Sequence, residues 1–255
     1  KYVIAGQGTI GLEILEQLDG KVDTILCPIG GGGIIAGIAV AAKGINPNIK
    51  IVGVQTANIP SMQESMKNGE VTTAFKSTTI ADGIAVKTPG DVTFEIINEL
   101  VDEVVVVEED EIAQGMLFLM ENQKVVAEGA GAVTTAALLS GKYVPKKDEN
   151  VVCVISGGNV DVNTLYRVIG TALTKEARRY SFNTVIQDKP GGLAELTKII
   201  SEYDANILSA NLSRSSMGGA LGSLTAEMVL ETFNHDHIDK LKVAITEAGF
   251  EIVEI

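Results

Sequence analysis

Four consecutive glycines constrain the fold of this chain more than any other feature: Gly30, Gly31, Gly32 and Gly33. This tetraglycine segment (residues 30–33) separates an apolar run at residues 24–29 from a second apolar run at 34–40. The first run predicts a buried strand and the second a helix. Without β-carbons, backbone N–H groups can converge on one anion, and the N-terminus of the following helix adds partial positive charge. The segment therefore indicates a phosphate cradle, with a flexible turn as the alternative.

Short β-rich segments alternate with helical patterns as far as about residue 165. The strand candidates are nearly continuous in apolar or β-branched residues, as in strands buried on both faces: residues 24–29, 50–55, 103–107 and 150–155. Helical patterns lie between them at residues 33–43, 110–123 and 131–139, and residues 71–89 are predicted to form an irregular loop. This rhythm predicts an α/β domain with a parallel sheet.

The pattern changes after a helical segment at residues 161–179, which is predicted to bridge two domains. Beyond it the sequence predicts strands at 181–187, 207–215, 223–232 and 250–254, helices after residue 191 and at 236–248, and a glycine-rich hairpin at 217–222. The order β-α-β-β-α-β is that of a small α+β module. The predicted domains are residues 1–178 and 179–255.

Composition excludes several classes of partner. The formal charge of −13 leaves no basic surface for nucleic acid or acidic lipid. Cys27 and Cys153 lie in apolar segments without C-x-x-C spacing, which predicts buried thiols in the reducing cytoplasm. No segment reaches the roughly 18 apolar residues of a membrane span, and residues 1–5 are not a signal peptide. Those residues instead predict a strand, and the missing initiator Met predicts that a further segment precedes them.

A second glycine pattern, Gly6-x-Gly8-x-x-Gly11, matches a dinucleotide-binding fingerprint if residues 1–5 form that strand. A dinucleotide site also needs an acidic residue at the tip of the next strand, where it binds the ribose. The tip here reads Cys27-Pro28-Ile29 and is followed by glycine. A nicotinamide-dependent dehydrogenase therefore stands only as an alternative.

Five segments in this order resemble the pyridoxal-phosphate-dependent threonine ammonia-lyases, or threonine dehydratases: Ala5-Gly6-Gln7-Gly8-Thr9-Ile10, the tetraglycine segment, Ala81-Asp82-Gly83, Glu128-Gly129-Ala130-Gly131-Ala132 and Ser156-Gly157-Gly158-Asn159. The C-terminal module resembles an ACT domain through Asp188-Lys189-Pro190-Gly191-Gly192-Leu193 and Asn206-Ile207-Leu208. The resemblance implies a fold-type II (tryptophan synthase β-like) domain followed by a ferredoxin-like ACT domain. It implies pyridoxal 5'-phosphate as cofactor and deamination of L-threonine, or serine, with 2-oxobutanoate and ammonia as the products from threonine.

The resemblance also implies roles for individual residues. The amides of Gly30, Gly31, Gly32 and Gly33 would bind the cofactor phosphate. The hydroxyl of Ser156 would face the pyridine nitrogen, with a turn residue as the alternative, and Gly83 would line the pocket. A hydroxyl does not enforce a protonated ring as a carboxylate would, which suits β-elimination. Glu128 is either an active-site carboxylate or a residue favoured by the helix N-terminus, and Asp82 is expected to organise its own loop.

One departure from the family concerns the lysine that links the cofactor covalently. In the family it sits in a Ser-Phe-Lys-x-Arg-Gly motif far upstream of the tetraglycine segment, and nothing in this sequence corresponds to that motif. Phe75-Lys76-Ser77 follows the tetraglycine segment and lacks the Arg-Gly, so it is not assigned this role. The chain is therefore expected to be an inactive fragment of the enzyme. The alternative is a non-enzymatic amino-acid sensor on a lyase-derived scaffold.

A second departure concerns metal. Related serine racemases bind a divalent cation through acidic residues after the strand at 50–55, where this chain has Gln55 and Ser61. Hard cations prefer carboxylate oxygens, so no metal site is predicted. His235 and His237 lie beside Asn234 and are predicted to form a solvated helix cap.

The ACT resemblance implies an amino-acid effector site made by four residues: Asp188, Gly191, Gly192 and Asn206. Two glycine amides at a helix start would bind a carboxylate, and Asn206 would bind an amino group. The alternative is that these residues only begin the helix and turn the chain. Modules with an exposed strand edge pair with a copy of themselves, so a homo-oligomer with ACT–ACT pairing is expected.

Overall fold

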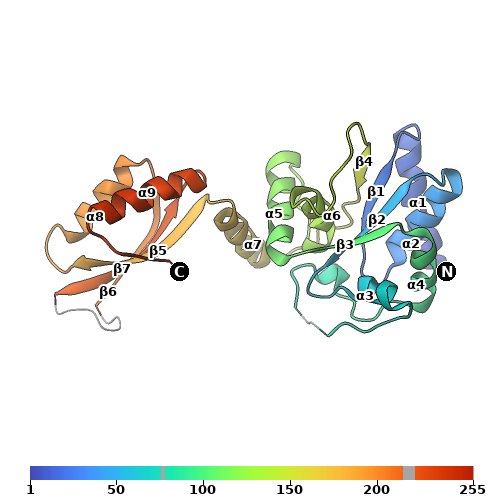
Figure 1. The fold of residues 1–255 in the computed structure, drawn as a ribbon, viewed down its shortest axis with the longest axis horizontal. Coiled ribbons are helices and arrows are strands. Elements are labelled where there is room, and N and C mark those ends of the chain that lie inside the picture. Colours follow the sequence, from blue (N-terminus) through green and yellow to red (C-terminus); the bar gives the residue numbers. More distant parts are fainter. Residues whose placement is uncertain (76–77, 215–221, 255) are drawn as a thin grey trace. The chain divides into compact units, whose positions relative to one another are not determined.

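The structure, a computed structural model, describes residues 1–75, 78–214 and 222–254 (Figure 1). The chain divides into two compact units, Lys1–Ile169 and Gly170–Ile255, and the boundary between them along the chain falls within helix α7 (Val162–Lys175). Two features considered above, Lys76 and the hairpin residues 217–221, lie outside the described residues.

The first unit is built around a four-stranded sheet of order β3-β2-β1-β4 in which every pairing is parallel. The predicted parallel sheet is therefore confirmed. Its strands are β1 (Thr24–Pro28), β2 (Lys50–Thr56), β3 (Glu103–Val107) and β4 (Val151–Cys153). Its helices are α1 (Tyr2–Gln17), α2 (Gly33–Ile45), α3 (Ser61–Asn68), α4 (Asp91–Leu100), α5 (Glu109–Phe118) and α6 (Gly129–Leu139), with a 3-10 turn η1 (Asp82–Ile84) and a π-helical turn η2 (Leu119–Gln123).

Helices cover both faces of this sheet. Figure 1 shows α1, α2 and α4 on one side and α5 and α6 on the other. All five residues of β1 are buried, and only Lys50 in β2 is partly exposed. Double coverage explains why these strands are continuously apolar rather than alternating.

The strand predicted at the N-terminus is wrong, because residues 2–17 form helix α1. Its glycines allow close packing on α2 and do not form a phosphate loop. A Cβ added to Gly8 would lie 3.2 Å from the Gly37 carbonyl oxygen, and one added to Gly11 would lie 3.2 Å from the Ile38 carbonyl oxygen. Because glycines three residues apart share one face of a helix, the same spacing serves helix packing as well as a turn. Packing of α1 on α2 therefore explains Gly8 and Gly11 of the Gly6-x-Gly8-x-x-Gly11 pattern without a dinucleotide.

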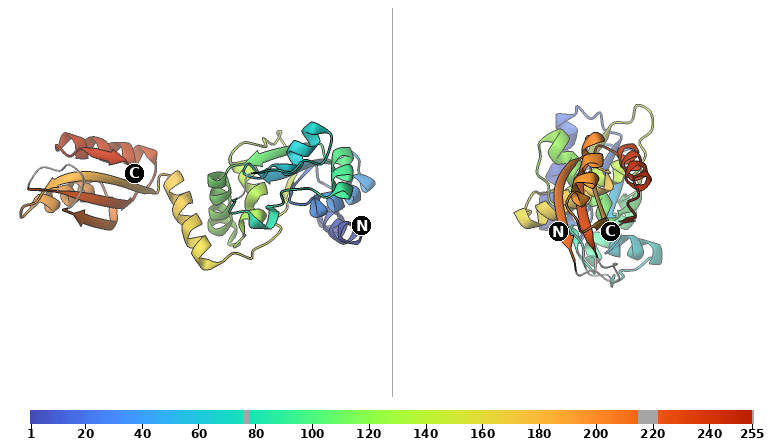
Figure 2. Two further views of the ribbon diagram at one scale, coloured as in Figure 1. Left: turned by 90° about the horizontal axis from the view of Figure 1, so that it is seen from below. Right: turned by 90° about the vertical axis from the view of Figure 1, so that its left-hand side faces the viewer.

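The second unit contains β5 (Arg179–Gln187), α8 (Gly192–Glu202), β6 (Asn206–Ser213), β7 (Ser223–Glu231), α9 (His235–Glu247) and β8 (Ile252–Glu254), the predicted element order. Its antiparallel sheet has the order β6-β7-β5-β8. Figures 1 and 2 show the helices on one face of the sheet. Phe182, Leu196 and Leu241 form the centre of its core. Among the described strands, β6 pairs only with β7, so one of its edges is open.

The two cysteines are free thiols. Cys27 is fully buried in β1, and this burial raises the pKa of its thiol. Cys153 is half-buried, and burial raises its pKa to about 11. Both thiols are therefore poor nucleophiles near neutral pH. None of the helices in the described ranges has the length and apolar character needed to cross a bilayer.

Candidate functional site

The candidate site lies at the carboxyl edge of the parallel sheet. Strand β1 leads into the tetraglycine segment, and the neighbouring strand β4 leads toward Ser156. Leu26 pairs with Cys153, and the Val154 amide donates to the Leu26 carbonyl oxygen over 3.0 Å. Because parallel strands end at the same edge, both loops leave the sheet on the same side. Ser156 itself is exposed.

The amides and the carbonyl oxygens of the tetraglycine segment differ in their hydrogen bonding. Within the described residues, none of its four amides donates a hydrogen bond to another protein group. By contrast, the Gly31 carbonyl oxygen accepts from the Thr93 hydroxyl over 2.6 Å, and that of Gly32 accepts from the Ala36 amide over 3.0 Å. Gly32 is the N-cap of α2, so these donors lie at the positive end of the helix dipole. This is the chemistry of an anion site.

At two of the four positions the surroundings leave little room for a β-carbon. At Gly32 φ is +90°, and an added Cβ would lie 2.7 Å from Ile97 Cδ1. At Gly30 it would lie 3.0 Å from Ile84 Cα. At Gly31 and Gly33 the nearest atoms are side-chain methyl carbons at 3.9 and 3.7 Å, which is ordinary contact. Neighbouring protein atoms therefore do not require glycine at positions 31 and 33.

Two buried polar side chains, Gln55 and Ser61, hydrogen-bond to backbone that adjoins the tetraglycine segment. Gln55 Nε2 donates to the Ile29 carbonyl oxygen over 3.4 Å, and Gln55 Oε1 accepts from the Gln63 amide over 2.9 Å. The Ser61 hydroxyl donates to the Val86 carbonyl oxygen over 2.7 Å. These positions, compared above with the metal ligands of serine racemases, are here part of the scaffold. No cluster of three potential metal-binding side chains occurs in the described part of the chain.

Glu128 lies between two loops of the site. It is the N-cap of α6, but its side chain makes no capping hydrogen bond. Its amide donates to the Gly157 carbonyl oxygen over 3.1 Å. A Cβ on Gly83 would lie 3.3 Å from Glu128 Oε1, and one on Gly157 would clash with the same carboxylate. The carboxylate thus packs against the backbone of both glycines, and its catalytic role stays a prediction.

The start of α6 packs against the same loops through glycines whose role the sequence reading missed. A Cβ on Gly129 would clash with the Ile80 carbonyl oxygen, and one on Gly131 with that of Gly157. The alternation of glycine and alanine from residue 129 to 132 was the available signal for this close approach. Asp82 Oδ1 accepts from the Gly83 amide over 2.8 Å, so this carboxylate holds its own turn.

In the second unit, three of the four predicted effector residues, Asp188, Gly192 and Asn206, already have hydrogen-bond partners. Arg214 donates two hydrogen bonds to the Asp188 carboxylate, over 2.8 and 3.2 Å, and this pairing lowers the pKa of Asp188. Gly191 has φ of +91° and is the N-cap of α8. The Gly192 amide donates to the Lys189 carbonyl oxygen over 3.1 Å. Asn206 Nδ2 donates to Glu231 Oε2 over 3.3 Å. A ligand would compete with these contacts.

The histidine pair lies at a helix start. Asn234 is the N-cap of α9, and its Oδ1 accepts from the His237 amide over 2.9 Å. His237 Nδ1 also accepts from the Phe233 amide over 3.1 Å. The cap is therefore formed by Asn234, with His237 packed beside it.

Residues 1–157 match the family model described as "Pyridoxal-phosphate dependent enzyme". The chain belongs to this family. The cofactor implied by the sequence resemblance is therefore the cofactor of the family. The L-threonine ammonia-lyase of Thermotoga maritima is 47% identical over 251 residues, which are 98% of this chain and 62% of the relative. The catabolic L-threonine dehydratase TdcB of Escherichia coli is 53% identical over 171 residues, 66% of this chain and 51% of the relative.

A solved structure shows the same fold. The processed form of threonine deaminase isoform 2 from Solanum lycopersicum aligns with a TM-score of 0.61 and 37% identity, covering 66% of this chain and 49% of that chain. This chain thus spans about half to three-fifths of the length of these three relatives.

Proposed function

We propose that this chain is the phosphate-binding portion of a threonine ammonia-lyase, which converts L-threonine to 2-oxobutanoate and ammonia. The observation that carries the proposal is the set of four amides leading into α2, none of which has an acceptor among the residues that the structure describes. Glycine at positions 31 and 33 is explained by a ligand that approaches closer than a β-carbon permits. The names and identities of the two curated relatives support threonine as substrate. Serine, which also carries a β-hydroxyl, is the second candidate.

Each loop of the site has a part in this proposal. The tetraglycine segment binds the phosphate, and Ser156 hydrogen-bonds the pyridine nitrogen. Gly83 presents backbone to the cofactor, and Glu128 is the candidate for holding a proton near the substrate. When bound, pyridoxal phosphate stabilises the negative charge left after an amino acid loses its α-proton. The chain contains no Ser-Phe-Lys-x-Arg-Gly segment, so we expect these residues alone to bind the cofactor without deaminating threonine.

The second unit is proposed to be an ACT domain, with residues 179–255 regulating a catalytic domain of which residues 1–178 are part. Its element order and open β6 edge support this assignment and the pairing of two copies through that edge. Asp188, Gly191, Gly192 and Asn206 are the proposed contacts for an amino-acid effector. The free thiols of Cys27 and Cys153 support a cytoplasmic location.

Replacement of Gly31 by alanine tests the cradle. A β-carbon fits the protein at this position but would occupy space that the phosphate needs. We expect Gly31→Ala to keep the melting temperature while weakening pyridoxal phosphate binding by about tenfold or more, which is about 1.4 kcal/mol. Fluorescence titration of the cofactor measures the dissociation constant, and inorganic phosphate serves as a competitor.

The matched control is Gly44→Ala, because Gly44 lies near the other end of α2, the helix that follows the tetraglycine segment, and has open space around its Cβ position. It should bind the cofactor as tightly as the unmodified chain. Equal affinities for Gly31→Ala and Gly44→Ala would contradict the cradle. Formation of 2-oxobutanoate from threonine by the chain alone would contradict the assignment of the covalent lysine to another segment.

A further inference from the structure

The backbone around Ile80 is attached to the sheet by the carboxylate of Glu109, a residue that neither the sequence reading nor the family match singled out. Glu109 is the first residue of α5 and is partly buried. Its Oε1 accepts from the hydroxyl of Thr56, the last residue of β2, over 2.9 Å. Its Oε2 accepts from the Ile80 amide over 2.7 Å. One carboxylate therefore joins a helix start, a strand end and a loop.

Further contacts attach the same loop to the end of β2. Asn58 Nδ2 donates to the Thr78 carbonyl oxygen over 2.7 Å. The Thr79 hydroxyl donates to Thr56 Oγ1 over 3.3 Å and accepts from the Ala81 amide over 3.0 Å. Of the acceptors in this group, only Glu109 is a carboxylate, and hydrogen bonds to charged groups are the stronger kind.

The attached loop continues into three positions of the candidate site. The Ile80 carbonyl oxygen lies against Gly129 at the start of α6. Gly83 lies against the Glu128 carboxylate, and Ile84 lies against Gly30. Residues 78–84 therefore form a wall that connects the tetraglycine segment with the start of α6. A displacement at Ile80 would be passed on to both.

We propose that Glu109 is a positioning residue for the cofactor: it holds residues 78–84 against Gly30 and Glu128 without touching the cofactor itself. The inference rests on the proposed function, because the wall has this role only if the cofactor binds between these loops. A carboxylate fits the task because its two oxygens accept from two different elements at once. Glutamine at this position keeps one acceptor oxygen and replaces the other with a donor.

The test compares Glu109→Gln and Glu109→Ala with the unmodified chain in three measurements. Hydrogen exchange of residues 78–84 reports the attachment of the loop. Titration with pyridoxal phosphate reports affinity, and the induced circular dichroism of the bound cofactor reports its orientation. We expect faster exchange at Ile80, about tenfold weaker binding and a reduced dichroic band in Glu109→Gln. Glu109→Ala should show larger changes in the same direction.

The matched control is Glu108→Gln, one residue earlier, because Glu108 caps the same helix start and is exposed. It should leave all three measurements unchanged. Unchanged cofactor affinity and dichroism in Glu109→Gln would overturn the positioning role, whether or not exchange at Ile80 rises. Failure of the unmodified chain to bind the cofactor would instead contradict the proposed function and, with it, this inference.

Discussion

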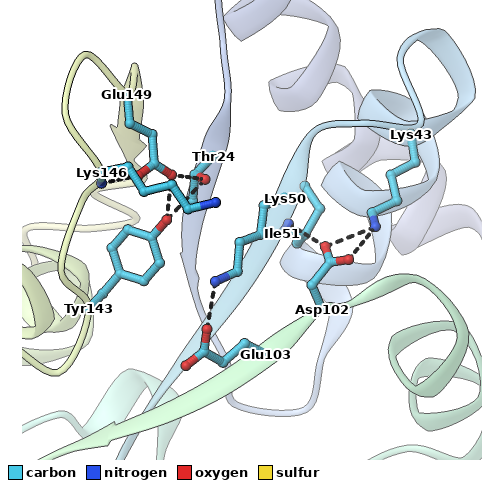
Figure 3. A network of polar contacts seen from close by, with 9 residues as sticks. All are labelled: Thr24, Lys43, Lys50, Ile51, Asp102, Glu103, Tyr143, Lys146 and Glu149. Atoms are coloured by element: carbon cyan, nitrogen blue, oxygen red, sulfur yellow. Dashed lines mark hydrogen bonds and ion pairs between the residues drawn. The ribbon is translucent and has the colours of Figure 1, made fainter.

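The carboxylate of Glu149 attaches the loop before β4 to the first residue of β1, at the sheet edge opposite the candidate site (Figure 3). Its Oε1 accepts from the Thr24 and Tyr143 hydroxyls, each over 2.5 Å. Its Oε2 accepts from the Lys146 amide over 2.6 Å. These hydrogen bonds, the one from Thr24 most and the one from Tyr143 next, lower the pKa of Glu149 from its usual 4.5 to about 2.

Replacing Glu149 by glutamine should therefore destabilise the protein in a pH-dependent way. A lowered pKa in the folded state gives stability that is present above pH 4.5 and is lost as the pH falls toward 2. We expect Glu149→Gln to lower the free energy of unfolding by about 1–2 kcal/mol at pH 7, because glutamine cannot accept all three hydrogen bonds. Urea unfolding between pH 7 and pH 3 measures the difference, which should shrink as the pH falls.

Glu13→Gln is the control for this measurement, since Glu13 is exposed on α1. Its effect should be within about 0.5 kcal/mol at each pH. A destabilisation by Glu149→Gln that stays constant down to pH 3 would show that the charge of Glu149 is not responsible.

Helices α1 and α2 approach each other closely at three glycines, where backbone of one helix lies against backbone of the other. A Cβ at Gly37 in α2 would clash with the Ile4 carbonyl oxygen and lie 2.6 Å from the Gly8 amide nitrogen in α1. Backbone atoms cannot move aside as the end of a flexible side chain can. The three glycines at positions 8, 11 and 37 therefore set the distance between the helices. This contact places α1 against the helix that begins at the tetraglycine segment.

Gly37→Ala should accordingly destabilise the first unit, although alanine is the better helix former. We expect a loss of about 2–3 kcal/mol from overpacking, larger than the gain of about 1 kcal/mol in helix propensity. Urea unfolding measures the change, and hydrogen exchange of α1 should become faster. Gly44→Ala in the same helix has no such contact and should be neutral or stabilising. Similar effects of the two substitutions would refute the close-packing explanation.

The two compact units have separate cores. Ile35 and Ile38 are buried in the first, and Phe182 and Leu241 in the second. Each unit therefore has its own source of stability, and a ligand bound to one unit need not stabilise the other. The proposed cofactor and effector sites lie in different units, which makes their effects separable.

We expect pyridoxal phosphate to slow hydrogen exchange in the first unit and an amino-acid effector to slow it in the second. A ligand at one hundred times its dissociation constant should stabilise its own unit by about 2.7 kcal/mol. Threonine, isoleucine, valine and serine are the effectors to compare. Absence of any response to all four amino acids would contradict the regulatory proposal while leaving the cofactor site unaffected.

Local sequence patterns predicted a large part of the fold and drew attention to the tetraglycine segment of the candidate site. Continuous apolar segments predicted β1, β2, β3 and β4, because strands buried on both faces have no polar side. The tetraglycine segment stood out because four glycines between a strand and a helix have few structural uses. The element order of the second unit also followed from its alternating patterns and turn residues.

Tertiary contacts decided the features that local patterns did not predict: the helix at the N-terminus, two short helices and the hydrogen bonds around the site. Residues 1–5 are too few to distinguish a strand from a helix, and packing of Gly8 and Gly11 on α2 settled the helix. Helices α3 and α4 escaped prediction for a similar reason: they are short and mostly polar or partly exposed. Gln55 and Glu109 gain their roles from partners far along the chain, Ile29 and Ile80. The sequence by itself determined the strands of the parallel sheet and the position of the tetraglycine segment between a strand and a helix, because both depend on neighbouring residues. Only the folded chain could show what holds that loop in place, because those hydrogen bonds join segments that meet on folding.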